Sequence, residues 1–268
     1  MTTYQNRLLA ALPRAELEAI EPYLEHVDLE RRMIAYDSER PITHVYFVED
    51  GVISIVSLVL DKSAIETATI GREGMIGLPL FHGVDVVPEQ AFVQVPGHGY
   101  RMTAQAFRQV IVSCPTLQRL LHRCSVAIFT LAAQHSACNR LHSMEQRCAR
   151  WLLTVHDRMS GDEFNLTQDF LSQMVGVRRA TVSEVASELQ KAGLISYSRG
   201  HIVIVNRAGL ERASCECYRI IRSTFARLLE GHDEPSPLAE VTTSEDGLSL
   251  AGDGGGSPER SRVDDESS

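Results

Sequence analysis

Two adjacent arginines begin a short segment whose side chains could read DNA: Arg178 and Arg179, followed by Thr181 and Ser183. A guanidinium can donate two hydrogen bonds to the O6 and N7 atoms of guanine, whereas hydroxyl and amide groups commonly contact phosphate. We therefore assign base reading to Arg179 and base or phosphate contact to Arg178 and Ser183. Phosphate contact is assigned to Thr181 and to the upstream Gln168.

Two short amphipathic helices, joined at Gly176, are predicted to position these side chains. Apolar residues follow helical spacing in both: Phe170, Leu171, Met174 and Val175 in the first, and Val182, Val185, Ala186 and Leu189 in the second. Glycine suits the tight turn between them because it tolerates positive φ. The apolar faces would form a core and leave the opposite face of the second helix available to DNA.

Residues 194–205 predict a hairpin directly after the second helix, with β-branched runs on either side of Ser198-Arg199-Gly200. We place Arg199 at its tip, where it would contact phosphate of the flanking groove. Two helices alone are also typical of an ordinary helical core. The hairpin favours a winged helix-turn-helix instead.

Several motifs resemble the Crp/Fnr transcription regulators. In the DNA-reading half these are Thr167-Gln-Asp, Met174-Val-Gly-Val, Thr181-Val-Ser and residues 189–195, which end in Gly-Leu-Ile. Upstream, residues 45–55 are similar to the family's strand-turn-strand unit, and residues 71–78 to the glycine-rich loop of its effector β-roll. The resemblance runs from about residue 8 to 210 and is strong in the DNA half.

The resemblance, together with the composition of the C-terminal region, predicts an α+β protein with five parts. These are a cupin-like antiparallel β-roll sensor domain that resembles cyclic-nucleotide-binding domains (1–114), a dimerisation helix and hinge (115–142), a Crp-type winged helix-turn-helix domain (143–212), a C-terminal helix (213–230) and a disordered acidic tail (231–268). It also implies a sequence-specific regulator that binds double-stranded DNA at a palindromic operator as a homodimer and acts with RNA polymerase. The alternatives are a haem or thiol/redox-sensing regulator of the same fold, or an interaction module that does not bind DNA.

An effector pocket is expected around Gly77, Leu78, Gln90 and Ala91. Nucleotide-binding relatives carry a glutamate for the ribose and an arginine for the cyclic phosphate, but here Leu78 and Gln90 stand at those positions. Without that arginine, the phosphate would lose charge-assisted hydrogen bonds that contribute about several kcal/mol. We therefore do not expect cyclic AMP to bind. His82 and His98 leave haem open as an alternative. An apolar effector, or a sensor half kept only as scaffold, fits the sequence equally, so the cofactor stays undefined.

A long helix is predicted for residues 115–139, because Pro115 is favourable at a first helical position. One stripe of this helix carries Leu117, Leu120, Leu121, Cys124, Ile128, Leu131 and His135. Such a stripe can be either intrachain core or the seam of a parallel dimer. The resemblance favours the dimer seam.

Six cysteines, at positions 114, 124, 138, 148, 215 and 217, include no Cys-x-x-Cys pair. We expect reduced, mostly buried thiols, with a redox or metal sensor as the alternative. Cys215 and Cys217 are predicted on one helix, pointing in different directions, which makes them a poor zinc chelate. The sequence therefore predicts no metal site.

The net charge of −9 is concentrated near the end of the chain. Residues 231–268 hold ten acids and two arginines among Gly, Ser and Pro, a composition that predicts disorder. The sequence contains no 18-residue apolar run and no secretory signal pattern at its start, so we expect a cytoplasmic protein without a membrane span. It also has no Ser/His/Asp order and no phosphate-cradling Gly-x-x-x-x-Gly-Lys loop, and we do not expect an enzyme.

Overall fold

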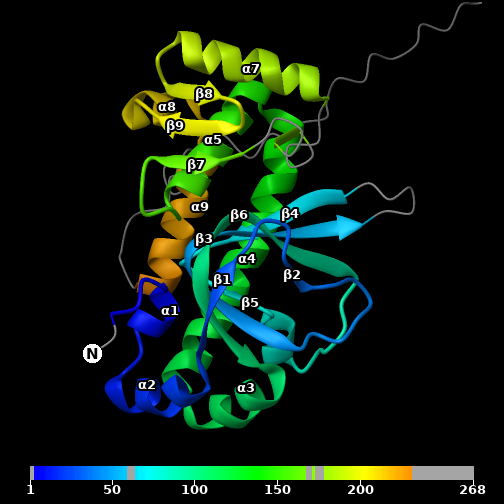
Figure 1. Cartoon of the computed structure of the whole chain (residues 1–268), viewed down its shortest axis with the longest axis vertical. Coiled ribbons are helices and arrows are strands. Elements are labelled where there is room, and N and C mark those ends of the chain that lie inside the picture. Colours follow the sequence, from blue (N-terminus) through cyan, green and yellow to red (C-terminus); the bar gives the residue numbers. More distant parts are fainter. Residues whose placement is uncertain (1–2, 59–63, 167–170, 173–177, 231–268) are drawn as a thin grey trace, which may run out of the picture.

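The computed structural model describes residues 3–58, 64–166, 171, 172 and 178–230. It combines an antiparallel sheet in the N-terminal half with a long central helix and a small α+β unit in the C-terminal half (Figure 1). The predicted mixed α+β fold is thereby confirmed. The first predicted helix of the helix-turn-helix lies mostly outside the described residues, and so do Gln168, Gly176 and the tail 231–268.

The N-terminal sheet has six antiparallel strands: β1 (Glu25–Leu29), β2 (Ile34–Tyr36), β3 (His44–Leu58), β4 (Ala64–Ile70), β5 (Met75–Ile76) and β6 (Glu89–Thr103). Strands β1, β6, β3 and β4 are neighbours in that order. Strand β2 pairs with β6, and β5 pairs with β3. The inward side chains of β3, among them Phe47 and Ile53, are fully buried.

Strand β3 runs through Gly51, where the sequence predicts a turn between two strands. The pairing of β3 with β6 shifts register between Val48 and Ile53, so bulges take the place of the predicted turn. Gly51 has a φ of 100°, and a Cβ there would lie 2.8 Å from the carbonyl oxygen of Val95. The strand can continue because glycine allows both this conformation and this close approach.

Short helices flank the sheet: α1 (Arg7–Ala10), α2 (Arg14–Ile20), η1 (Glu21–Tyr23), η2 (Leu78–His82), α3 (Ala104–Val110) and η3 (Ile111–Ser113). The Thr103 side chain caps α3 by accepting a hydrogen bond from the Ala106 amide. Glu16 of α2 accepts hydrogen bonds from the amides of Thr116 and Leu117. The lead-in helices are thereby fixed to the start of the central helix.

The central helix α4 (Pro115–Leu141) crosses the molecule from one half to the other (Figure 1). Leu117, Leu121, Cys124 and Leu131 pack in the core of the β-roll, where each has at most 1% of its surface exposed. The predicted stripe is therefore intrachain core, and its assignment to the dimer seam is wrong. The sheet and a later helix, α9, cover it.

The C-terminal unit begins with α5 (Met144–His156), which starts at a capping box of Ser143 and Gln146. It continues through β7 (Glu163–Asn165), α7 (Arg179–Lys191), β8 (Ile195–Ser198), β9 (His201–Ile204) and α8 (Arg207–Ala213). The sheet order is β7-β9-β8, so a third strand joins the predicted hairpin.

Helix α9 (Cys217–Phe225) leads the chain back toward the N-terminal half and lies along α4 (Figure 1). The π-helical turn η4 (Ala226–Glu230) continues it. Ile221, Phe225 and Leu229 enter the same apolar core as the sheet. The last described segment therefore packs in the same apolar core as the N-terminal helices and strands.

Candidate nucleic-acid interface and the junction behind it

Helix α7 has the two faces that the sequence predicts. Val182 and Leu189 have at most 1% of their surfaces exposed and pack against α5, whereas Arg178 and Arg179 are exposed at its N-terminal end. Arg178 is the N-cap residue, and Arg179 is the first helical residue. Thr181 and Ser183 follow in the first turns, half-buried, and the Ser183 hydroxyl donates to the Arg179 carbonyl oxygen at 3.1 Å.

The hairpin β8–β9 lies beside α7 at the outer end of the molecule (Figure 1). Arg199 and Gly200 form its tip, with φ values of 51° and 82°, as a tight two-residue hairpin turn requires. The Arg199 side chain is exposed at this tip, where the sequence places it. Arg178, Arg179 and Arg199 are therefore all exposed, at the start of α7 and at the tip of the hairpin.

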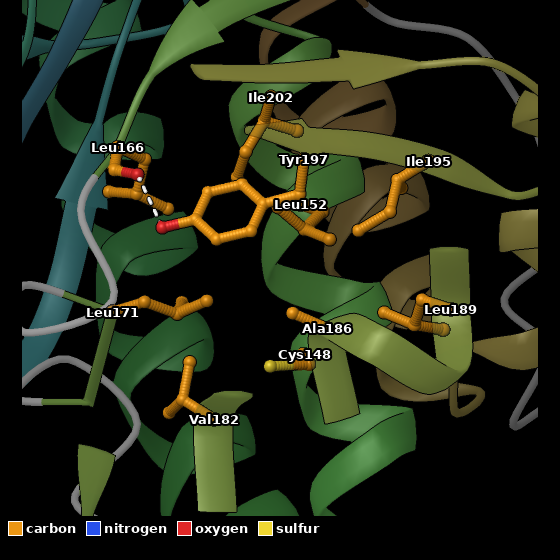
Figure 2. Close-up of a pocket in the computed structure, with 10 residues that line it drawn as sticks. All are labelled: Cys148, Leu152, Leu166, Leu171, Val182, Ala186, Leu189, Ile195, Tyr197 and Ile202. Atoms are coloured by element: carbon orange, nitrogen blue, oxygen red, sulfur yellow. Dashed lines mark hydrogen bonds between the residues drawn. The ribbon is translucent and has the colours of Figure 1, made fainter. Parts of the chain in front are cut away.

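An apolar core holds α7 and the wing in place, and Figure 2 shows its side chains converging from α5, α7, β8 and β9. The Tyr197 hydroxyl crosses this core and donates to the Leu166 carbonyl oxygen at 3.3 Å. The cavity between the side chains has a volume of about 10 Å³. Since that is barely room for one water molecule, the cavity is a packing gap and not an effector site.

The four predicted effector residues lie along the β-roll in two pairs. Gly77 and Leu78 follow β5; a Cβ on Gly77 would touch His44 and Val45 at the beginning of β3. Gln90 and Ala91 pair with residues near the other end of β3. Gln90 Nε2 donates to Asp37 Oδ1 at 2.7 Å, and Ala91 is fully buried. That these four residues line one effector pocket stays a prediction.

The two histidines considered for haem have different neighbours. His82 Nε2 lies 2.7 Å from Ser125 Oγ on α4. The His98 ring lies 5.7 Å from the ring of His26, between centroids.

A buried polar network joins the β-roll to the DNA-reading half. Trp151 Nε1 on α5 donates to Glu66 Oε1 on β4 at 3.1 Å, and Ser54 Oγ lies 2.7 Å from Glu66 Oε2. Burial raises the pKa of Glu66 to about 7, although the hydrogen bonds from Ser54 and Trp151 act in the opposite direction. The carboxyl group therefore stays protonated in the folded protein up to near-neutral pH.

Arginines of the DNA-reading half supply the other contacts of this junction. Arg150 Nη1 donates to His135 Nε2 at 2.8 Å, and burial, together with the charge of Arg150, lowers the pKa of His135 to about 3. Arg158 forms a buried ion pair of 2.6 Å with Glu73. It lies across Gly71, where a Cβ would be 2.5 Å from the Arg158 side chain. Sequence reasoning missed this junction because its partners are far apart in the chain.

The cysteines depart from the sequence expectation in one respect. All six are buried, as predicted. However, Cys215 precedes α9 and Cys217 begins it, so the two are not on successive positions of one helix. Both sulfur atoms face Cys138 at the end of α4. The reason given for a poor chelate, divergence on a helix, is therefore wrong.

Comparison with known proteins agrees with this geometry. Residues 146–213 match the family model of the Crp-like helix-turn-helix domain. No curated protein sequence matches the chain.

Solved structures with similar folds include a regulator of the Crp/Fnr family from Eubacterium rectale, with a TM-score of 0.58 and 16% identity over 77% of this chain and 96% of that one. FixK2 from Bradyrhizobium japonicum has a TM-score of 0.60 and 17% identity over 72% and 98%. The c-di-GMP responsive global regulator CLP from Xanthomonas campestris has a TM-score of 0.55 and 18% identity over 72% and 99%.

The β-roll, the long helix and the matched helix-turn-helix domain together have the arrangement found in transcription regulators of the Crp/Fnr type. The chain has the Crp/Fnr-type regulator fold and carries the Crp-like helix-turn-helix domain of that family. The predicted resemblance is thereby confirmed. Within the described ranges, no helix has the length and apolar character of a membrane span.

Proposed function

We propose that the protein is a sequence-specific regulator that binds a palindromic operator as a homodimer. The exposed arginines at the start of α7, next to an arginine-tipped wing, are the observation that carries this proposal. In such a domain the second helix enters the major groove with its N-terminal residues toward the bases. Arg179 would then read a base, and Arg178 and Ser183 would contact bases or phosphate.

Phosphate contacts complete the proposed interface. Thr181 lies in the first turn of α7 and Arg199 at the wing tip, both suited to backbone contacts that set orientation without reading sequence. Gln168, outside the described residues, is proposed for the same role. RNA polymerase would be the partner of the DNA-bound dimer, in the cytoplasm, and no catalytic role is proposed.

The proposed parts of the chain are the sensor domain (1–114), the dimerisation helix and hinge (115–142), the winged domain (143–212) and the C-terminal helix (213–230).

For dimerisation we propose the outer face of α4, opposite the buried stripe. Its exposed apolar residues recur every three or four positions: Val126, Phe129, Ala133, Ala137 and Leu141. Val126 is 54% exposed, Phe129 76% and Leu141 63%, which is unusual for large apolar side chains in a monomer. A parallel pair of α4 helices would bury this stripe.

The effector is proposed not to be cyclic AMP. Where a cyclic phosphate would need a cation, Gln90 is bonded to the carboxylate of Asp37. A second anion there would be repelled rather than neutralised.

Selection from a pool of random duplexes, followed by gel-shift titration at two salt concentrations, tests the proposal. The selected site should be palindromic, with half-sites about one helical turn apart, and should bind at least about 10³-fold more tightly than random DNA. Its affinity should fall steeply with salt as counterions are released. Equal affinity for selected and random DNA would show that the protein binds DNA without sequence specificity. Absence of binding would favour the alternative of an interaction module that does not bind DNA.

A further inference from the structure

Four side chains with metal-binding atoms meet where α4 ends and α9 begins: Cys138, His142, Cys215 and Cys217. Their sulfur and nitrogen atoms all lie within 4.8 Å of one another. Cys138 Sγ is 3.5 Å from Cys215 Sγ, and Cys217 Sγ is 3.5 Å from His142 Nδ1. The three cysteines have at most 2% of their surfaces exposed and form a cluster separate from both apolar cores.

These distances suit a single ion with tetrahedral coordination. Zinc binds sulfur at about 2.3 Å and imidazole nitrogen at about 2.0–2.1 Å, so its ligand atoms lie roughly 3.5–3.8 Å apart. The 3.5 Å contact between Cys138 and Cys215 is too long for a disulfide, whose sulfur atoms are about 2.05 Å apart. An iron-sulfur cluster would hold its ligands further apart than one ion does.

Neighbouring groups prepare the four ligands. His142 Nε2 donates to Glu216 Oε1 at 3.0 Å, which directs the lone pair of Nδ1 toward the thiols. Gln134 Nε2 donates to Cys217 Sγ at 3.1 Å. Three thiolates and one divalent cation leave a net charge of −1, and the charges of the nearby Arg147 and Arg150 act on Cys138. The site would therefore be charge-balanced as well as shaped for a cation.

We propose that Cys138, His142, Cys215 and Cys217 form a structural zinc site. Thiolate and imidazole ligands favour zinc among the common divalent ions, and four protein ligands leave no open position for catalysis. Because His142 is the C-cap of α4 and Ser143 caps α5, the ion would connect the hinge to the segment that follows the winged domain. It would fix the DNA-reading half to α4 at a second point.

Metal analysis of the full-length protein, purified without chelator and reconstituted with Zn²⁺, tests the site. We expect about one zinc per chain. Cys217→Ser and His142→Asn should bind zinc much more weakly, beyond the roughly 10–100-fold loss expected for Glu216→Ala, an outer-sphere change. Cys114→Ser, which alters a buried thiol elsewhere, should keep full zinc content.

A second readout does not depend on variants that fold poorly. Co²⁺ added to the metal-free wild-type protein should give the visible bands of tetrahedral cobalt and a thiolate charge-transfer band, both removed by Zn²⁺. Failure of the wild-type protein to bind either ion would overturn the proposal. So would full zinc binding by folded Cys217→Ser, or isolation with iron and acid-labile sulfide in place of zinc.

Discussion

The indole of Trp151, in the DNA-reading half, donates its hydrogen bond to the carboxyl group of Glu66, in the β-roll, over 3.1 Å. Both residues are buried, so this contact lies inside the junction and not on its rim. Any rotation of one half against the other must break this bond in an environment where water cannot replace it. The protonation state of Glu66 is therefore linked to how firmly the halves are joined.

Replacing Glu66 by Gln should change how stability depends on pH. Folding raises the Glu66 pKa from 4.5 to about 7, so between these values the folded protein holds a proton that the unfolded chain releases. This group therefore lowers the unfolding free energy as pH rises. From pH 4.5 to 6.5, Glu66→Gln should gain about 2 kcal/mol relative to wild type in urea titrations. Glu30→Gln makes the same change at an exposed site and is the control; an equal gain there would rule out Glu66 as the cause.

His135 should contribute the opposite slope. Its pKa falls from 6.5 to about 3 on folding, so the unfolded chain binds a proton that the folded protein excludes, and stability rises with pH over this interval. His135→Gln should lose about 2 kcal/mol relative to wild type as pH rises from 4.5 to 6.5. The same urea titrations measure it, with the exposed His26→Gln as control. A pH-independent difference would show that folding does not shift the His135 pKa.

Phe129→Glu should convert the proposed dimer to a monomer, because a carboxylate would have to be buried in the seam. Light scattering should give half the wild-type mass, with an unchanged circular dichroism spectrum. Val112→Glu adds the same charge at another exposed apolar site and should remain dimeric. A dimeric Phe129→Glu would place the seam elsewhere.

Arg179→Ala should weaken binding to the selected operator by about 1–3 kcal/mol and relax base preference at one position of each half-site. Gel shifts on operator and random duplexes, compared with wild type, measure both effects. Equal losses on the two duplexes would remove Arg179 from base reading and leave Arg178 and Ser183 as candidates.

Arg199→Ala should weaken operator and random DNA alike, because a wing-tip contact with phosphate carries no sequence information. The slope of log affinity against log salt should fall by about one unit, as expected for one lost phosphate contact. An unchanged slope would show that the wing tip does not touch the DNA.

The winged domain could be predicted from the sequence because its signals are local. The apolar spacing from Val182 to Leu189 lies within helix α7 itself, and Arg199-Gly200 forms the hairpin turn that it predicts. Strand β7, with only three residues, carries no such pattern and is defined by its pairing with β9. Sequence reasoning therefore found the hairpin and missed its third strand.

Which face of α4 is buried within the chain could not be predicted from the residues of α4 alone. The helix has apolar side chains on two faces, and the buried face is selected by the sheet and by α9, whose Ile221 and Phe225 are about a hundred residues away. The cysteine group was hidden for the same reason. Cys138 meets Cys215 only because α9 begins at residue 217 and returns along α4.

The return of α9 also bears on the order in which the protein can fold during synthesis. Ile221, Phe225 and Leu229 belong to the core of the N-terminal half, yet they are translated after the whole winged domain. The β-roll therefore cannot finish its interior until nearly all of the described chain has left the ribosome. A fragment ended at the hinge would lack these core side chains and would expose the α4 surface that they cover.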